Sequence, residues 1–120
     1  MLPKVSLYNT LTQKNQTLPN NVDHTISLYV CGATVYDHCH IGHGRIKVVF
    51  DAWVKMLRAT GYKMTYVMNV TDIDDKIIKK AEQMGINAAE VAIHFTQEMQ
   101  SVDRMLGLAK PDHEPRATAY

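Results

Sequence analysis

The chain has 120 residues, of which 46% are hydrophobic and 21% charged, a balance that is ordinary for one soluble globular domain. Its formal net charge of +1 gives no general electrostatic reason to expect binding to nucleic acid. No stretch approaches the roughly 20 apolar residues that span a bilayer, and no signal-peptide pattern opens the chain. We therefore expect a cytoplasmic protein without membrane contacts, in which Cys31 and Cys39 are not joined by a disulfide.

The first part of the chain predicts two strands. Residues 5–12 alternate in a strand-like way, and residues 13–23, which include Pro19, predict a loop. Residues 26–31 predict a short buried strand, and residues 32–40 a loop from that strand into a helix.

An amphipathic helix is predicted from Gly42 to about Thr60, with Gly61 as its C-cap. Its apolar stripe, which we expect to face the core, consists of Ile46, Phe50, Trp53 and Leu57. Its opposite face, which we expect to be solvated, consists of Arg45, Lys47, Asp51, Lys55 and Arg58. Tyr29, in the preceding strand, is also expected in the core.

The second part of the chain predicts one strand and two helices. Residues 64–70 form the strand, and Thr71 is the predicted N-cap of a helix that reaches about Met84. Asn87 with Glu90 predicts a capping box for a longer helix. Its apolar stripe consists of Val91, Phe95, Val102 and Leu106, and Gly107 ends it. Capping and dipole complementarity explain most of the acidic cluster Asp72, Asp74 and Asp75.

The order strand, helix, strand, helix indicates an α/β fold with a parallel sheet and a right-handed crossover. In such sheets, ligands bind beyond the carboxyl ends of the strands. Residues 31–43 and residues 69–75 both follow strands. We therefore expect these two segments to meet at one site.

The segment from Tyr29 to Arg45 is the most informative stretch of the sequence. His40 and His43 lie one helical turn apart on one face, at the start of the predicted helix, where free backbone N–H groups attract anions. Gly42 between them lets a flat or bulky ligand approach the backbone. These residues predict a site for a nucleotide and its phosphates.

The sequence His40-Ile41-Gly42-His43 closely resembles the HIGH signature of class I aminoacyl-tRNA synthetases, and the residues before it resemble cysteinyl-tRNA synthetases in particular. The resemblance also covers residues 7–12, 69–76 and 111–118. It implies the N-terminal half of a Rossmann-like nucleotide-binding fold of the class I synthetase type. Because that family is several times longer, we expect residues 1–120 to be an N-terminal portion of its catalytic domain, inactive alone.

The resemblance also implies roles for individual residues. His40 and His43 would be catalytic, by binding the phosphates of ATP, and Gly42 would carry the adenine. Gly32 and Thr71 would contact the substrate cysteine. The ATP-binding set would consist of Ala33, Thr34, Tyr36, His40, Ile41, Gly42 and His43.

Cys31 has three interpretations. Read alone, a cysteine at a strand end is most often a small buried hydrophobe. A local zinc site could instead group Cys31, His38, Cys39, His40 and His43, although this cluster lacks the paired spacing of structural zinc sites. The resemblance implies that Cys31 is one zinc ligand, with the other three in a part that this chain lacks, and that Cys39 only packs.

The resemblance implies a cysteine–tRNA ligase that acts in protein biosynthesis. Its substrates would be ATP with Mg²⁺, L-cysteine and tRNA(Cys), its cofactor Zn²⁺, and the full-length protein would be a monomer. Two alternatives remain at this point: a ligase of the same fold that joins activated cysteine to an amino sugar in thiol biosynthesis, and a stand-alone nucleotide- or metal-binding module. The basic face of the first helix is a further candidate for contacts to acceptor-stem phosphates, although charge alone does not show such contacts.

Overall fold

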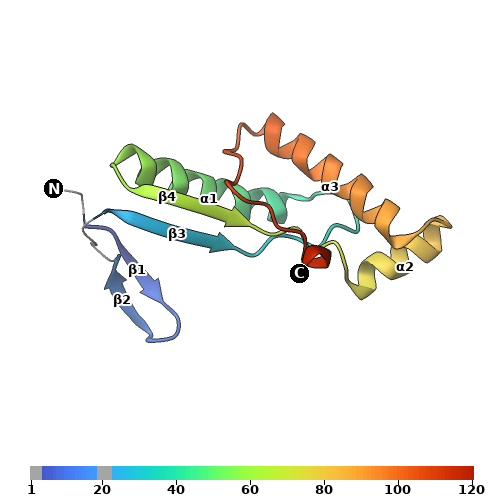
Figure 1. Ribbon diagram of the computed structural model, residues 1–120, viewed down its shortest axis with the longest axis horizontal. Coiled ribbons are helices and arrows are strands. Elements are labelled where there is room, and N and C mark those ends of the chain that lie inside the picture. The colour runs from blue at the N-terminus through green and yellow to red at the C-terminus, as the bar shows by residue number, and fades with distance from the viewer. Residues whose placement is uncertain (1–3, 19–22) are drawn as a thin grey trace.

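The computed structural model describes residues 4–18 and 23–120, and its elements follow one another as Figure 1 shows. In chain order they are β1 (Ser6–Asn9), β2 (Lys14–Thr17), β3 (Thr25–Val30), α1 (Ile41–Ala59), β4 (Lys63–Met68), α2 (Asp75–Met84), α3 (Ala88–Met105) and a 3-10 turn (Ala117–Ala119). In this described part of the chain, no helix is long and apolar enough to cross a membrane.

The predicted parallel sheet is confirmed. β3 pairs with β4 in parallel, from Thr25 opposite Lys63 to Val30 opposite Met68, and α1 is the crossover between them. One hydrophobic cluster lies between α1 and these strands and is formed by Val30, Val54, Tyr66 and Met68. The carboxyl ends of both strands therefore point to the same edge of the sheet, beyond which α2 begins (Figure 1).

A second hydrophobic cluster holds α2 and α3 together beyond this edge. The two helices pack against each other and against the loop after β3. Its fully buried members include Val35, Ile77 and Val91. The loop that contains Val35 is thus anchored by a core of its own.

The C-terminal segment adds a third hydrogen-bonded partner to the sheet, which the sequence did not predict. Residues 112–117 run beside β4 and its continuation, with isolated parallel bridges from Val67 to His113 and from Val70 to Arg116. The Met68 N–H donates to the His113 carbonyl at 3.1 Å, so Met68 is paired on both sides. This segment closes one edge of the sheet.

The prediction of a loop over residues 13–23 is wrong in part, because Lys14–Thr17 form β2, antiparallel to β1. β1 also ends at Asn9 rather than at residue 12, since a turn follows in which the Asn9 side chain accepts a hydrogen bond from the Leu11 N–H. All four β2 residues are exposed, so no alternation of apolar side chains marks the strand. Pro19 lies outside the described residues.

The predicted faces of α1 are also corrected. Lys47 and Asp51 are buried, with 8% and 9% of their surface exposed, whereas Ile46 is 51% exposed. These two charged side chains tolerate burial because each has a polar partner. The Lys47 ammonium donates to Asp103, and Asp51 accepts from the Ala109 N–H. Exposed basic residues on this helix have partners too: Lys55 bonds Asp51, and Arg58 bonds Asp112.

Some of the other predicted core residues are buried, and some are exposed. Leu57 is buried and Phe50 and Trp53 are half-buried, as expected of the α1 stripe. Tyr29 is 62% exposed and Leu106 is 50% exposed, so their assignment to the core is wrong. Tyr29 alternates with Leu28 and Val30 and therefore lies on the opposite face of β3, and Leu106 lies just after the end of α3.

The helix caps confirm one prediction and change another. Asn87 and Glu90 form the predicted capping box at the start of α3. α2 begins after Asp74, not after Thr71, because the Asp74 carboxylate accepts from the Lys76 N–H at 2.9 Å. Thr71 is instead held in an extended segment beside Thr34.

Candidate functional site

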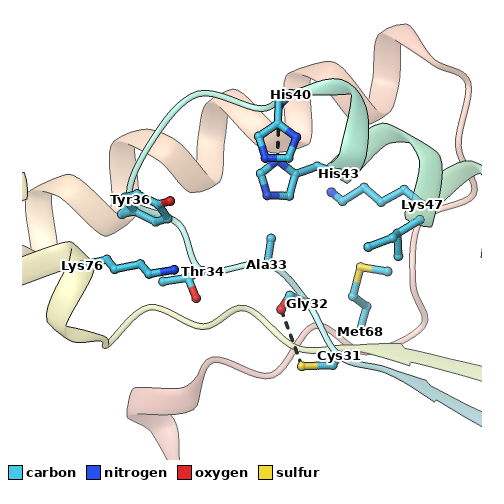
Figure 2. Close-up of a pocket in the computed structure, with 11 residues that line it drawn as sticks. Cys31, Gly32, Ala33, Thr34, Tyr36, His40, His43, Lys47, Met68 and Lys76 are labelled. Atoms are coloured by element: carbon cyan, nitrogen blue, oxygen red, sulfur yellow. Dashed lines mark hydrogen bonds between the residues drawn. The ribbon is translucent and has the colours of Figure 1, made fainter.

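A cleft with a volume of about 400 Å³ lies at the carboxyl ends of β3 and β4. The loop after β3 forms its floor, α1 one wall, and the start of α2 the far end (Figure 2). The two segments predicted to meet do so at the expected edge of the sheet, through the Thr34–Thr71 bridge, although residues 69–75 do not line the cleft. The lining residues are Cys31, Gly32, Ala33, Thr34, Tyr36, His40, His43, Ile46, Lys47, Met68 and Lys76.

Most of the predicted site residues line this cleft, and three do not. Ile41 is 92% exposed and belongs to the first turn of α1, and Gly42 lies against the His40 ring. Thr71 lies behind the floor, where its carbonyl accepts from the Val35 N–H at 3.2 Å and its hydroxyl accepts from the Asn69 amide at 3.2 Å. Thr71 thus supports the loop that forms the floor.

Four lining residues were not predicted: Ile46, Lys47, Met68 and Lys76. Met68 is the last residue of β4, and Lys76 lies in the first turn of α2. Their positions just after or at the carboxyl end of a strand are the signal that could have found them. Lys47 was missed because the apolar residues of α1 placed it on the solvated face.

Gly32 allows the floor to pass close to the neighbouring segment. Its N–H donates to the Asn69 side-chain oxygen at 2.7 Å. A Cβ atom at Gly32 would lie 1.7 Å from the Asn69 carbonyl oxygen, so no other residue fits without a backbone shift. The contact fixes the loop from β3 against the segment after β4.

His40 and His43 stack on each other, with ring centroids 3.9 Å apart and an angle of 27° between the planes. His40 is the N-cap of α1, and its Nδ1 accepts from the Gly42 N–H at 3.1 Å. The Nδ1 of His43 accepts in turn from the His40 N–H at 3.2 Å. Because both Nδ1 atoms accept, each neutral ring carries its proton on Nε2 and has that N–H available to donate.

Burial lowers the pKa of His43, and the nearby His40 and Lys47 lower it further. The imidazole of His43 therefore stays neutral to lower pH than an ordinary histidine. A neutral ring still donates from Nε2, so donation from this ring requires no prior protonation.

The cleft is basic in character. Lys47 and Lys76 line it with the two histidines, and its lining within residues 4–18 and 23–120 includes no carboxylate. The Lys76 ammonium lies 5.3 Å from the centre of the Tyr36 ring, within the range of a cation–π contact. Such a lining suits an anionic ligand.

Two side-chain contacts at the surface tie the loop after β3 to the helices around it. His38 Nδ1 lies 2.7 Å from a Glu98 carboxylate oxygen of α3, and Lys80 of α2 lies 3.2 Å from Asp37. The hydrogen bond from the His38 backbone N–H lowers the pKa of Asp37 most, and the contact with Lys80 lowers it further. The pairs hold the loop just before the histidines.

Cys31 presents an exposed thiol at the floor of the cleft, and its Sγ lies 3.7 Å from the Gly32 carbonyl. The interpretation of Cys31 as a buried hydrophobe is therefore wrong. In the part of the chain that the structure describes, no three His, Cys, Asp or Glu residues are grouped to hold a metal, so the local zinc cluster is not formed. Cys39 is half-buried against the α2–α3 core, and burial raises its thiol pKa, which confirms that it packs.

Residues 17–120 match the protein family described as tRNA synthetases class I (C) catalytic domain. The chain belongs to this family. The α/β fold with a parallel sheet and flanking helices agrees with half of a Rossmann-like class I catalytic domain.

Three curated relatives illustrate the similarity. The chain is 48% identical over 116 residues to a cysteine–tRNA ligase of Cupriavidus necator, 47% over 114 residues to one of Legionella pneumophila, and 49% over 114 residues to one of Bordetella avium. These alignments cover 97%, 95% and 95% of the chain and 25%, 25% and 24% of the relatives. The chain thus spans about a quarter of the length of the curated relatives that it matches.

Proposed function

We propose that this chain is the N-terminal portion of the catalytic domain of a cysteine–tRNA ligase. The complete enzyme would activate L-cysteine with ATP and transfer it to tRNA(Cys). The names of the curated relatives support this function over an amino-sugar ligase or a stand-alone binding module. The observation that carries the proposal is the paired Nε2–H groups of His40 and His43 beside a basic cleft, with the Cys31 thiol at its floor.

The histidines would act by stabilising charge. When a carboxylate attacks the α-phosphorus of ATP, negative charge grows on the phosphate oxygens and on the leaving pyrophosphate. Two N–H donors on neutral rings, held by their own backbone hydrogen bonds, can bind such oxygens without changing protonation. ATP would enter with Mg²⁺, the usual companion of its phosphates.

The remaining ATP contacts would come from the rest of the signature loop. Ala33, Thr34 and Tyr36 line the cleft. A Cβ at Gly42 would lie 2.8 Å from the His40 ring, so Gly42 is needed for the ring to rest against the helix start. Adenine binding at Gly42 and an ATP contact from the exposed Ile41 remain part of this proposal.

Cys31 would be one ligand of a Zn²⁺ ion, and Gly32 and Thr71 would help to place the substrate cysteine. The exposed Cys31 thiol fits a single tetrahedral position. The described residues offer no group of three ligands, so the other ligands would come from the part of a full-length enzyme beyond this chain. Bound zinc would supply a preference for sulfur over oxygen. Thr71 acts through the loop, because it lies behind the floor of the cleft.

The same proposal includes the wider setting: a monomeric enzyme of protein biosynthesis in the cytoplasm, with tRNA(Cys) as its nucleic-acid partner. Arg45 is exposed on α1 and remains a candidate for contacts to phosphates of the tRNA.

Cysteine-dependent ATP–pyrophosphate exchange tests the proposal. A complete protein that contains this sequence should exchange with cysteine and much less with serine, and should charge tRNA(Cys). Residues 1–120 alone should show no exchange, because half of the ATP site and most zinc ligands would be missing. If the complete protein showed no exchange with either amino acid, the proposed function would be refuted. Exchange by residues 1–120 alone would refute the need for the missing half.

A further inference from the structure

Lys47 is a buried cation at the edge of the cleft. Only 8% of its surface is exposed, yet it is among the lining residues. It lies four positions after His43 and so on the same face of α1, one turn further along. Figure 2 shows its side chain extending from α1, with the nitrogen end directed toward His43 in this view.

One carboxylate accompanies this cation. The ammonium donates to both oxygens of Asp103, at 2.7 Å and 2.6 Å, and Asp103 lies near the end of α3. An ammonium has three N–H groups, so this pairing leaves one of them without an acceptor. Among the described residues, Asp103 is the only acceptor that Lys47 has. A buried charge that retains an unused donor is a ready ligand contact.

Asp103 and the cleft lie on different sides of the Lys47 ammonium. Asp103 does not line the large cleft, whereas both residues line a small hollow of about 20 Å³ behind it. The carboxylate therefore lies behind the ammonium, and the ammonium borders the cleft. Because the described lining of the cleft contains no carboxylate, an anionic group in the cleft would share Lys47 only with Asp103, which lies outside that lining.

We propose that Lys47 binds an anionic oxygen of the ligand in this cleft, and that Asp103 positions its ammonium for that contact. The inference rests on the proposed function for the identity of the ligand. The oxygen belongs either to a phosphate of the nucleotide or to the carboxylate of the amino acid, since both carry the same chemistry.

A second lysine of α1 provides the matched control. Lys55 also pairs with an aspartate, Asp51, at 2.8 Å, but its side chain is 55% exposed and it does not line the cleft. It also donates to the Gly107 carbonyl at 3.0 Å. Lys47→Met and Lys55→Met therefore remove the same charge from the same helix, once at the cleft and once outside it.

The experiment measures binding by calorimetry on the complete protein. The probes are ATP against adenosine, which lacks phosphates, and cysteine against cysteamine, which lacks the carboxylate. Lys47→Met should weaken one charged probe by roughly 10-fold or more, the scale of a hydrogen bond to a charged group, and leave its uncharged counterpart unchanged. Loss for ATP identifies the phosphate, loss for cysteine identifies the carboxylate, and Lys55→Met should alter neither.

A double variant guards against a merely structural effect. Lys47→Met leaves Asp103 unpaired, so Lys47→Met/Asp103→Leu removes both charges and should show the same selective loss with a restored melting temperature. Equal changes for charged and uncharged probes, or no change at all, would overturn the inference. Cysteine-dependent exchange by the unaltered protein tests the proposed function separately, because the protein could bind the charged probes without catalysing exchange.

Discussion

The carboxylate of Asp72 accepts two hydrogen bonds from Thr118, one from its N–H at 3.0 Å and one from its hydroxyl at 2.7 Å. Asp72 is buried and follows β4, so this contact joins the C-terminal segment to the residues that lead into α2. Burial, the largest influence, raises the pKa of Asp72, but the Thr118 hydrogen bonds and Arg116 outweigh it and the net pKa is lowered. Asp72 is therefore a structural residue.

Asp72→Ala should lower the free energy of unfolding by about 1–3 kcal/mol, because it leaves two Thr118 donors without their acceptor. Urea denaturation measures the loss. Glu82→Ala, at an exposed position of α2, is the control and should change stability by less than about 0.5 kcal/mol. Equal stability of the two variants would show that solvent replaces the Asp72 contacts without cost.

Gly32→Ala should destabilise the protein by at least about 2 kcal/mol, because the new Cβ would meet the Asn69 carbonyl oxygen at 1.7 Å. Gly44→Ala is a contrasting change, since the nearest atom to its Cβ is 4.0 Å away and the position is helical. It should stabilise by about 0.5–1 kcal/mol. Thermal melts of both variants check the pair, and a neutral Gly32→Ala would mean that the loop shifts easily.

His40→Ala or His43→Ala in the complete enzyme should slow adenylate formation by roughly 10²–10³, the scale for the loss of one donor to transition-state charge. Binding of ATP should weaken less than the rate falls. Single-turnover kinetics separate these two quantities. Normal adenylation combined with reduced folding stability would assign the pair to the helix cap alone.

Cys31→Ser in the complete enzyme should lose zinc and the preference for cysteine over serine together, while ATP affinity changes much less. Metal analysis and the ratio of cysteine to serine activation are measured on one preparation. Cys39→Ala, at a half-buried position that packs against the α2–α3 core, should retain both. Stoichiometric zinc with unchanged selectivity in Cys31→Ser would disprove the ligand role.

Stability should decrease as the pH falls below about 6.5, the unfolded value for histidine. Because the pKa of His43 is lowered in the folded state, the unfolded chain binds more protons between the two values, and stability therefore rises with pH in that window. His43→Gln should flatten this dependence. The urea midpoints of both proteins are compared at pH 7.5 and pH 5. An equal change of midpoint between these pH values in the unaltered protein and in His43→Gln would contradict the lowered pKa.

The parallel sheet, the capping box at Asn87 and the position of the histidines were predictable because each depends on local pattern or on strand direction. The burial of Lys47 was not, since its partner Asp103 lies 56 positions away. β2 was missed because strand pairing is made by the backbone, and its exposed polar side chains carry no signal. The pairing of residues 112–117 with β4 depends on a fold already formed.

The double pairing of Met68 determines which side of the cleft can adjust. The backbone of Met68 is fixed by β3 on one side and by His113 on the other, so the end of β4 cannot move without separating three chain segments. The loop that carries Asp37 and His38 toward His40 is held from outside by side-chain pairs that water can replace. Adjustment to ligands of different size should therefore come from residues 37–40 of this loop and not from the end of the sheet.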